Sequence, residues 1–431
     1  MKMGWKTYYQ NHQMTADEAV SHIKSGDRVV LGHAVGEPCH LVEAMVRHAE
    51  DYQDVEIVHM VAMGKCEYCK PEYAKSFRHN SLFLGKTSRE AEEEGLADFT
   101  PCFLFEVPRL FERTLPVDVA MISVTPPDEK GHCSLGVSVD YTYGAAKNAK
   151  YVIAQVNAKM PHTSGAYLDV TEIDSFVLYD EPTLVLPPPK ITEIEESIGR
   201  YCASLIQDGD TLQLGIGAIP DAVLRFLKDK KDLGIHSETF SDGVVELVEA
   251  GVITNAKKTL HPGKFISTLM MGTQRLYDFV DHNPDVELYP VDYSNHPNTI
   301  AKNENMVSIN SAIEVDLMGQ VNAETIGTRQ FSGIGGQVDY IRGTALARNG
   351  RSIIAMHAAA KGSSKIVAQL EPGAVVTSSR CDVDYVVTEY GIAHLKGETL
   401  RTRARRLIQI AHPDFRPELM AAYEARFHEP F

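Results

Sequence analysis

The first third of the chain alternates short apolar runs with longer segments in which apolar residues recur at helical spacing. Residues 28–31 (Arg-Val-Val-Leu), 55–60 (Val-Glu-Ile-Val-His-Met) and 117–122 (Val-Asp-Val-Ala-Met-Ile) are runs of strand length. Residues 41–48, between the first two runs, have the spacing of a helix. Strand, helix and strand in this order predict βαβ units and a mostly parallel sheet, so we expect an α/β fold.

Three prolines at 187–189 divide this pattern, because they exclude a helix and favour an extended, stiff connector. After them the pattern restarts. Residues 206–215 (Ile-Gln-Asp-Gly-Asp-Thr-Leu-Gln-Leu-Gly) follow the order of residues 23–32 (Ile-Lys-Ser-Gly-Asp-Arg-Val-Val-Leu-Gly), 183 positions later throughout. We therefore predict two similar α/β domains with mostly parallel sheets, an N-terminal one over 1–186 and a C-terminal one over 187–431.

Glu238 is the candidate chemical residue of the second half. It lies in residues 234–243 (Gly-Ile-His-Ser-Glu-Thr-Phe-Ser-Asp-Gly), where a short strand is predicted to end in a turn. Asp242 has a structural role near the cap of the next helix, whereas Glu238 has none. Side chains at the carboxyl ends of strands in open α/β sheets point into the ligand crevice. A solvated loop acid is the alternative; at this place the first half has Met60 or a neighbour.

A glycine turn, residues 215–221 (Gly-Ile-Gly-Ala-Ile-Pro-Asp), follows a predicted strand and precedes a predicted helix over 222–227. Such a turn presents backbone N–H groups to an anion, with the helix dipole behind them. Glu238 follows Gly217 by 21 residues, which also matches the dinucleotide fingerprint, except that Pro220 replaces its third glycine. Three interpretations stay open: a purely structural turn, a contact for a coenzyme phosphate or pantetheine, and a nicotinamide dinucleotide site.

A second glycine cluster lies in residues 331–339 (Phe-Ser-Gly-Ile-Gly-Gly-Gln-Val-Asp). Three glycines in four positions let the backbone approach a ligand and direct N–H groups at developing negative charge. A mobile surface loop is the alternative. Asn295, in Ser-Asn-His-Pro (294–297), stands before a predicted turn, and turn formation is the default role of such an asparagine.

The composition excludes several classes of protein. A net charge of −16 over 431 residues argues against a surface for nucleic acid or anionic membranes. Residues 1–6 lack the apolar core of a secretion signal, and no run approaches the ~18 apolar residues of a membrane span. Seven cysteines, an odd number, fit reduced thiols, and the pair Cys66 and Cys69 is at best half a zinc site. We expect a cytoplasmic protein whose apolar core needs no metal or disulfide to hold it together.

Several motifs in combination resemble those of a known family. They are Gly-Ile-Gly-Ala-Ile-Pro-Asp-Ala (215–222), the stretch 234–243, Ser-Asn-His-Pro (294–297), Gly-Ile-Gly-Gly-Gln-Val-Asp (333–339), Glu-Tyr-Gly-Ile-Ala-His-Leu-Lys-Gly (389–397) and Ala-His-Pro-Asp-Phe-Arg (411–416). Together they resemble the acetyl-CoA hydrolase/transferase family, and within it the 4-hydroxybutyrate and butyrate CoA-transferases. The resemblance covers nearly the whole chain and is densest after residue 190.

The resemblance implies two α/β domains of the CoA-transferase type. It implies movement of CoA between short-chain acids, such as 4-hydroxybutyrate or butyrate with acetyl-CoA or acetate, through a glutamyl-CoA thioester. Coenzyme A would be a co-substrate, with no permanently bound cofactor. The implied partners are acyl-CoA and short-chain carboxylates, in a homodimer or a larger homo-oligomer, without nucleic acid or a membrane.

Site residues are carried over by motif. The resemblance implies Glu238 as the nucleophile, Asn295 as the amide beside it and Gly336 as an oxyanion contact. The implied contacts to coenzyme A are Gly215, Ile216, Gly217, Ala218, Ile219, Ser332, Gly335, Gly336 and Lys361. The alternatives are an acyl-CoA hydrolase that uses the same glutamate, a dinucleotide-dependent enzyme, and a catalytically silent binding module of the same fold.

Overall fold

The computed structural model describes residues 4–431, whose chain forms two compact units. The first unit comprises Met1–Leu186 and Ile266–Ser294, and the second comprises Pro187–Phe265 and Asn295–Phe431. Residues 1–3, on which part of the expectation about a secretion signal rests, lie outside the described residues. The chain first passes between the units at the start of the proline run, between Leu186 and Pro187. The division into domains 1–186 and 187–431 stays a prediction.

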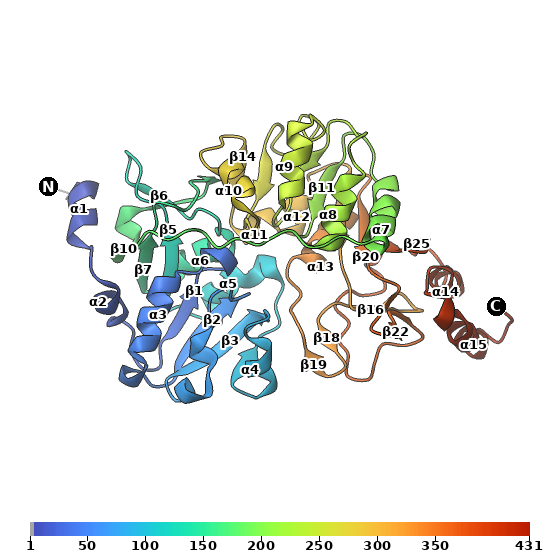
Figure 1. The fold of residues 1–431 in the computed structure, drawn as a ribbon, viewed down its shortest axis with the longest axis horizontal. Helices are drawn as coiled ribbons and strands as arrows, with labels where there is room; N and C mark the ends of the chain where they lie inside the picture. Colours follow the sequence, from blue (N-terminus) through green and yellow to red (C-terminus); the bar gives the residue numbers. More distant parts are fainter. Residues whose placement is uncertain (1–3) are drawn as a thin grey trace. The chain divides into compact units, whose positions relative to one another are not determined.

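A seven-stranded sheet forms the centre of the first unit, and every pair of neighbouring strands runs parallel. In sheet order its strands are β10 (Ser175–Leu178), β7 (Tyr151–Val156), β5 (Val119–Val124), β1 (Arg28–Leu31), β2 (Val55–Met60), β3 (Phe77–Phe83) and β4 (Ala97–Phe99). Figure 1 shows β1, β2 and β3 side by side. The parallel α/β architecture expected from the sequence is confirmed.

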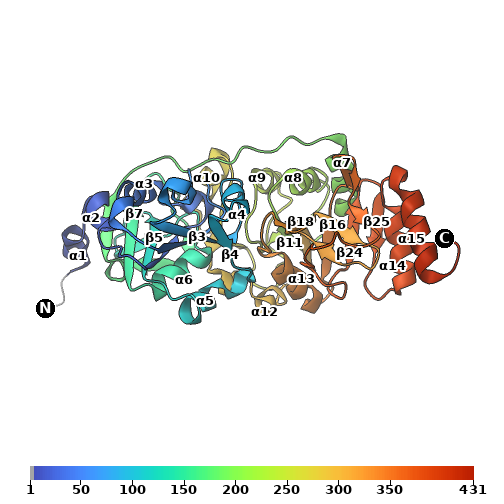
Figure 2. The ribbon, with the colours of Figure 1, turned by 90° about the horizontal axis from the view of Figure 1, so that it is seen from below.

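Helices cover both faces of this sheet. Figure 2 shows α3 on one face and α5 and α6 on the other. The helices of the first unit are α1 (Trp5–Asn11), α2 (Ala16–Val20), α3 (Cys39–Arg47), α4 (Arg89–Glu93), α5 (Val107–Arg113), α6 (Asp140–Asn148), α10 (Gln274–Val280) and α11 (Val291–Ser294). Because both faces are covered, the central strands are buried almost throughout, which explains why they read as continuous apolar runs.

The second unit has a six-stranded sheet. Its first five strands follow the same order as β2, β1, β5, β7 and β10 of the first sheet. These are β12 (Gly234–Ile235), β11 (Thr211–Leu214), β15 (Met306–Asn310), β20 (Arg351–Ala355) and β24 (Tyr385–Thr388), followed by β25 (Gly391–His394). Neighbouring strands of this sheet are parallel except β24 and β25, which are antiparallel. Thus β12, β11 and β15 correspond to β2, β1 and β5 of the first unit.

Helices also cover both faces of the second sheet, with α8 and α9 on one face and α13 on the other (Figure 2). The helices of this unit are α7 (Glu193–Ser204), α8 (Ala218–Arg225), α9 (Asp242–Glu249), α12 (Pro297–Ile300), α13 (Gln337–Leu346), α14 (Leu400–Gln409) and α15 (Arg416–Phe427). The remaining short strands are β6 (His132–Ser134), β8 (Ser164–Gly165), β9 (Tyr167–Asp169), β13 (Phe265–Ser267), β14 (Val286–Leu288), β16 (Glu314–Asp316), β17 (Val321–Asn322), β18 (Thr325–Ile326), β19 (Arg329–Gln330), β21 (Ala359–Ala360), β22 (Ser363–Ser364) and β23 (Ile366–Val367).

The repeat seen in the sequence is also a repeat of local structure. Gly26 and Gly209, 183 positions apart, both adopt left-handed backbone, with φ of 83° and 80°. Asp27 then accepts from the backbone N–H of Lys24, and its counterpart Asp210 accepts from that of Gln207 in the same way. Identical turns therefore lead into β1 and β11.

A second repeat was not predicted, and it lies where α6 and α13 begin. Val-Asp-Tyr-x-x-Gly at 139–144 recurs at 338–343, an offset of 199. Gly136 and Gly335 precede these segments at the same offset, with φ of 59° and 56°. The similarity of the two sheets thus extends to the loops and helices at their carboxyl ends.

One predicted helix boundary is wrong. The helix expected over 222–227 is α8, which begins at Ala218 and ends at Arg225. Gly217 is its N-cap at φ 127°, a conformation that favours glycine, so the chain turns directly from the glycine turn into the helix. Pro220 lies within the first turn, which tolerates proline because no intrahelical N–H bond is lost there.

Two findings concern the wider chain. Among residues 4–431, no helix combines the length and the apolar character needed to cross a membrane. All seven cysteines are free thiols, and the sulfur atoms of Cys66 and Cys69 lie 3.1 Å apart.

Candidate active site

Glu238 lies just beyond the carboxyl end of β12, held by bonds from both of its neighbours. The Ser237 hydroxyl donates to the carbonyl of Leu214 at 3.0 Å, and Thr239 forms a bridge with Leu214. Leu214 is the last residue of β11, so these contacts attach the Glu238 bend to the start of the glycine turn. Glu238 itself is half-buried. A side chain held in this way keeps a defined direction at the ligand edge of the sheet.

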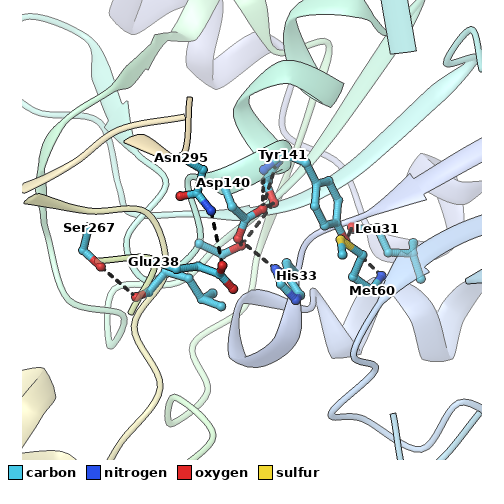
Figure 3. A network of polar contacts seen from close by, with 11 residues as sticks. Leu31, His33, Met60, Asp140, Tyr141, Glu238, Ser267 and Asn295 are labelled. Atoms are coloured by element: carbon cyan, nitrogen blue, oxygen red, sulfur yellow. Dashed lines mark hydrogen bonds and ion pairs between the residues drawn. The ribbon is translucent and has the colours of Figure 1, made fainter. Parts of the chain in front are cut away.

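Asn295 brings an amide to the Glu238 carboxylate. Its Nδ2 donates to Oε2 of Glu238 at 3.2 Å, as Figure 3 shows. Asn295 is fully buried and directly precedes His296, the N-cap of the short helix α12. The turn position expected for this asparagine and its contact with Glu238 therefore occur together.

Gly336 brings a backbone segment against the same carboxylate. A Cβ built at Gly336 would lie 2.0 Å from Oε2 of Glu238 and 2.6 Å from Nδ2 of Asn295, so no side chain fits there. Gly336 is also the N-cap of α13, a helix of ten residues. The first backbone N–H groups of a helix have no intrahelical acceptor and carry the positive end of its dipole. The carboxylate, the amide and this helix start together suit a site where negative charge develops.

The glycine turn 215–219 follows Leu214 immediately and is half-buried. Gly215, Ile216 and Gly217 form the turn, and Ala218 and Ile219 begin α8. Position alone does not separate the coenzyme interpretations, because an acid after the second strand also occurs in dinucleotide sites.

Three further predicted contacts lie in loops of the same unit. The Ser332 hydroxyl donates to the carbonyl of Ala323 at 3.0 Å, which braces the second glycine cluster. Gly335 adopts φ 56°, and so directs the chain into Gly336. Lys361 is exposed at the tip of the hairpin formed by β21 and β22. The structure thus joins Glu238, Asn295 and Gly336 directly, and records other contacts for Ser332.

Sequence reasoning missed two residues of this region, Ser237 and Tyr340. Ser237 attaches the Glu238 bend to β11, as described above. Tyr340 is fully buried near the start of α13, and the charge of Glu238 contributes to raising its pKa, after the larger effect of burial. The signal for Tyr340 was available in the repeated Val-Asp-Tyr-x-x-Gly segment.

The residues of the first unit at the equivalent edge are arranged differently. The paired strands place Arg28 beside Glu56 and Thr211 beside Gly234, so Glu238 corresponds to Met60. The Tyr141 hydroxyl accepts from the N–H of Met60 at 3.2 Å and donates to the carbonyl of Leu31 at 2.9 Å (Figure 3). The position equivalent to Glu238 therefore carries a thioether in the first unit, and the nearby carboxylate of Asp140 is paired with His33 at 3.0 Å. A carboxylate at this strand position is found only in the second of the two units.

No group of three or more His, Cys, Asp or Glu side chains within residues 4–431 is arranged to hold a metal ion. The groups gathered at Glu238 are its carboxylate, the Asn295 amide and the backbone at Gly336. The amide and the backbone N–H groups can donate hydrogen bonds to an acyl oxygen or an oxyanion.

Known proteins are similar to this chain in sequence and in fold. The acetyl-CoA hydrolase/transferase N-terminal domain matches residues 1–187, and the C-terminal domain of the same family matches residues 272–423. A 4-hydroxybutyrate coenzyme A transferase of Clostridium kluyveri is 59% identical over 429 residues, covering 99% of this chain and 100% of that protein.

Two solved structures extend the similarity to the fold. A 4-hydroxybutyrate CoA-transferase from Porphyromonas gingivalis has a TM-score of 0.84 at 43% identity, over 98% of this chain and 100% of that one. RipA from Yersinia pestis has a TM-score of 0.92 at 35% identity, over 99% and 100% of the two chains. The resemblance expected from the motifs is confirmed: this chain belongs to the acetyl-CoA hydrolase/transferase family.

Proposed function

We propose that this protein is a CoA-transferase that moves coenzyme A between short-chain carboxylic acids, with Glu238 as its nucleophile. The observation that carries the proposal is the Glu238 carboxylate, bonded to Asn295 at 3.2 Å and lying against the backbone of Gly336. A carboxylate placed beside oxyanion donors is the arrangement that acyl transfer through an enzyme-bound ester or anhydride requires.

The acid substrates are proposed from the relatives. Since a protein 59% identical over its full length is named 4-hydroxybutyrate coenzyme A transferase, 4-hydroxybutyrate with acetyl-CoA is the first pair to assign. A more distant relative, 34% identical, is named butyryl-CoA:acetate CoA-transferase, which makes butyrate and acetate the second pair.

The reaction begins when one oxygen of Glu238 attacks the thioester carbonyl of acyl-CoA. The C–S bond breaks, and an acyl-glutamyl anhydride and CoA thiolate result. The thiolate then attacks Cδ of Glu238, the free acid leaves, and a glutamyl-CoA thioester remains. A second carboxylate enters and the steps run in reverse, so the thioester free energy is conserved and no redox cofactor is needed.

Each addition in this sequence generates an oxyanion that must be stabilised. The Nδ2 of Asn295 and the backbone N–H groups at the start of α13 are the proposed donors. One well-placed donor of this kind lowers the barrier by roughly 3–4 kcal/mol. Because both are held by buried structure, they need little reorganisation during the reaction.

Coenzyme A is proposed to contact the two glycine segments. Gly215, Ile216, Gly217, Ala218 and Ile219 form the first, whose N–H groups suit the phosphates or the pantetheine amides. Ser332, Gly335 and Gly336 form the second. Lys361, exposed on its hairpin, is proposed as a phosphate contact. Binding of the remote nucleotide would help to orient the thiol.

An acyl-CoA hydrolase with the same nucleophile is the second candidate, because the family description covers hydrolases and transferases. Measuring CoA release from butyryl-CoA with and without acetate separates the two. A transferase forms acetyl-CoA when acetate is present and releases little free CoA in its absence. Release of free CoA at full rate without acetate would overturn the transferase proposal in favour of the hydrolase.

Cytoplasmic location and homo-oligomeric assembly also remain predictions. Sedimentation of the purified protein would measure the assembly, and a mass equal to that of one chain would contradict it.

A further inference from the structure

The hydroxyl of Tyr340 is a buried polar group whose role is not explained by the fold. Tyr340 follows Gly336 by four residues in α13, and its side chain is fully buried. Its oxygen has no hydrogen-bond partner among the described residues. Buried polar groups are satisfied in the great majority of cases, so an unsatisfied hydroxyl in this position calls for an explanation.

Tyr141 in the first unit shows where such a hydroxyl reaches. Tyr141 and Tyr340 occupy the same place in the Val-Asp-Tyr-x-x-Gly repeat. The oxygen of Tyr141 bridges the last residues of two strands, Leu31 of β1 and Met60 of β2. In the first unit the tyrosine is therefore a structural link across the carboxyl edge of the sheet.

The corresponding residues in the second unit are Leu214 and Glu238. The carbonyl of Leu214 accepts from the Ser237 hydroxyl at 3.0 Å, and makes no bond with Tyr340. Ser237 thus takes over the link that tyrosine makes in the first unit. The Tyr340 ring lies edge-on to the ring of His236, two residues before Glu238, with the ring centroids 6.4 Å apart. Burial and the Glu238 charge raise the pKa of this phenol well above 10, so it keeps its proton and acts as a donor.

We infer that the Tyr340 hydroxyl donates a hydrogen bond to the glutamyl oxygen of Glu238 while that side chain is acylated. The inference rests on the proposed glutamyl mechanism and adds a third donor to Asn295 and the start of α13. It explains why a serine replaces the tyrosine as the link between strand ends in this unit only.

The step it assists balances without an added acid or base. When CoA thiolate adds to Cδ of the anhydride, the C–S bond forms and the carbonyl π electrons move to the glutamyl oxygen. That oxyanion accepts from Tyr340, then re-forms the carbonyl as the C–O bond to the leaving acid breaks. Tyr340 keeps its proton throughout, so its contribution is a hydrogen bond to transition-state charge.

Tyr340→Phe tests the inference, and Tyr141→Phe is the matched control. Tyr340→Phe is expected to lower kcat by about 100-fold with little change in KM, and to leave the urea midpoint of unfolding unchanged. Tyr141→Phe loses the hydrogen bonds to Met60 and Leu31, so it is expected to lower the urea midpoint while kcat changes far less. A kcat within about twofold of wild type in Tyr340→Phe would overturn the inference. So would equal losses of midpoint and kcat in both variants.

Ser237→Ala, measured alone and combined with Tyr340→Phe, gives a second test. Without the serine hydroxyl, the Leu214 carbonyl is expected to accept from Tyr340 and draw the donor away from Glu238. We therefore expect kcat to fall in Ser237→Ala, and to fall no further when Tyr340→Phe is added. Fully additive losses, or an unchanged kcat in Ser237→Ala, would contradict the inference.

Trapping the thioester separates this inference from the proposed function. Rapid quench of wild-type protein mixed with butyryl-CoA measures formation of the glutamyl-CoA thioester. If wild type forms none, the proposed function fails. If wild type forms it and Tyr340→Phe forms it at the same rate, the proposed function stands and only the role of Tyr340 is overturned.

Discussion

The carboxyl edges of the two sheets start from one plan and end with opposite properties. In the first unit the edge carries Met60, and Tyr141 binds the backbone of both strand ends. In the second unit Glu238 stands in the place of Met60, with Asn295 bonded to it and Ser237 making the strand link. At this position the first unit therefore has a tyrosine link between two strand ends, while the second has a carboxylate bonded to an amide.

The glycine loops show the same contrast in their backbone. Gly136 and Gly335 share a left-handed conformation, but the next residue is Val137 in the first unit and Gly336 in the second. The Val137 side chain is fully buried in its unit, whereas a side chain at Gly336 would collide with Glu238. The comparison teaches that a few substitutions in a repeated framework are enough to place a carboxylate beside hydrogen-bond donors at one edge and not at the equivalent position of the other.

The largest expected effect is that of removing the carboxylate. Glu238→Gln keeps the size of the side chain but cannot form the anhydride, so transfer activity should fall by at least about 1,000-fold. Activity with butyryl-CoA and acetate measures it, with circular dichroism as the control for folding. Retention of even a tenth of the activity would mean that the two edges do not differ in the way proposed.

Removal of the amide is expected to have the next largest effect. Asn295→Ala takes away the donor that lies 3.2 Å from Glu238. Loss of one such donor should lower kcat by about 100- to 1,000-fold. Asn295→Asp is the informative companion, because it replaces the donor by a second carboxylate of similar shape. If Asn295→Asp were as active as wild type, hydrogen-bond donation by this residue would be disproved.

Gly336→Ala tests the contrast between the glycine loops. Its Cβ would lie 2.0 Å from the Glu238 carboxylate, so the loop or the acid must move, and a shift of this size should cost about 100-fold in kcat. Val137→Ala, at the equivalent position of the first unit, should lower the melting temperature and leave kcat within about twofold. Equal effects of the two variants on kcat would remove the distinction between the loops.

The smallest effect concerns the buried acid of the first unit, Glu37. Burial raises the pKa of its carboxyl from 4.5 to about 7, against the opposing hydrogen bond from the N–H of Gly64. Between these values the folded chain holds a proton that the unfolded chain has released, so stability falls as pH rises through this range. The loss is at most about 1.4 kcal/mol per pH unit.

Glu37→Gln should remove this slope, because the amide stays neutral and still accepts from Gly64. Urea midpoints of the variant and of wild type, measured from pH 5 to pH 8, should diverge in favour of the variant as pH rises. Parallel curves would show that Glu37 is already charged in the folded protein.

Local patterns predicted much of the fold and the location of Glu238. The strands Arg28–Leu31 and Val55–Met60 are present as predicted, because buried parallel strands are continuous apolar runs between glycine turns. The repeat indicated that Glu238 is equivalent to Met60 or to a neighbour of Met60. The strand register identifies Met60 as the equivalent residue. Such information lies within short segments, where spacing and turn chemistry decide the structure.

Contacts between distant segments were beyond the pattern of the sequence. Asn295 binds Glu238 across 57 residues, and its importance was expected only from the family resemblance. Ser237 reaches Leu214 across 23 residues, and nothing in its neighbours distinguishes it from other turn serines. Residues 266–294 pack with the first unit although the segments on both sides of them in the sequence belong to the second. This placement also depends on contacts between distant elements. The start of α8 was missed because residues 218–221 were assigned to the glycine turn.

The central claim is that Glu238 becomes covalently bonded during turnover. Protein exposed to butyryl-CoA, treated with borohydride and digested should show Glu238 reduced to the corresponding alcohol. Untreated protein and Glu238→Gln should show no such product. A fully active enzyme in which the Glu238 peptide stays unmodified, or in which another residue is reduced in its place, would contradict the account.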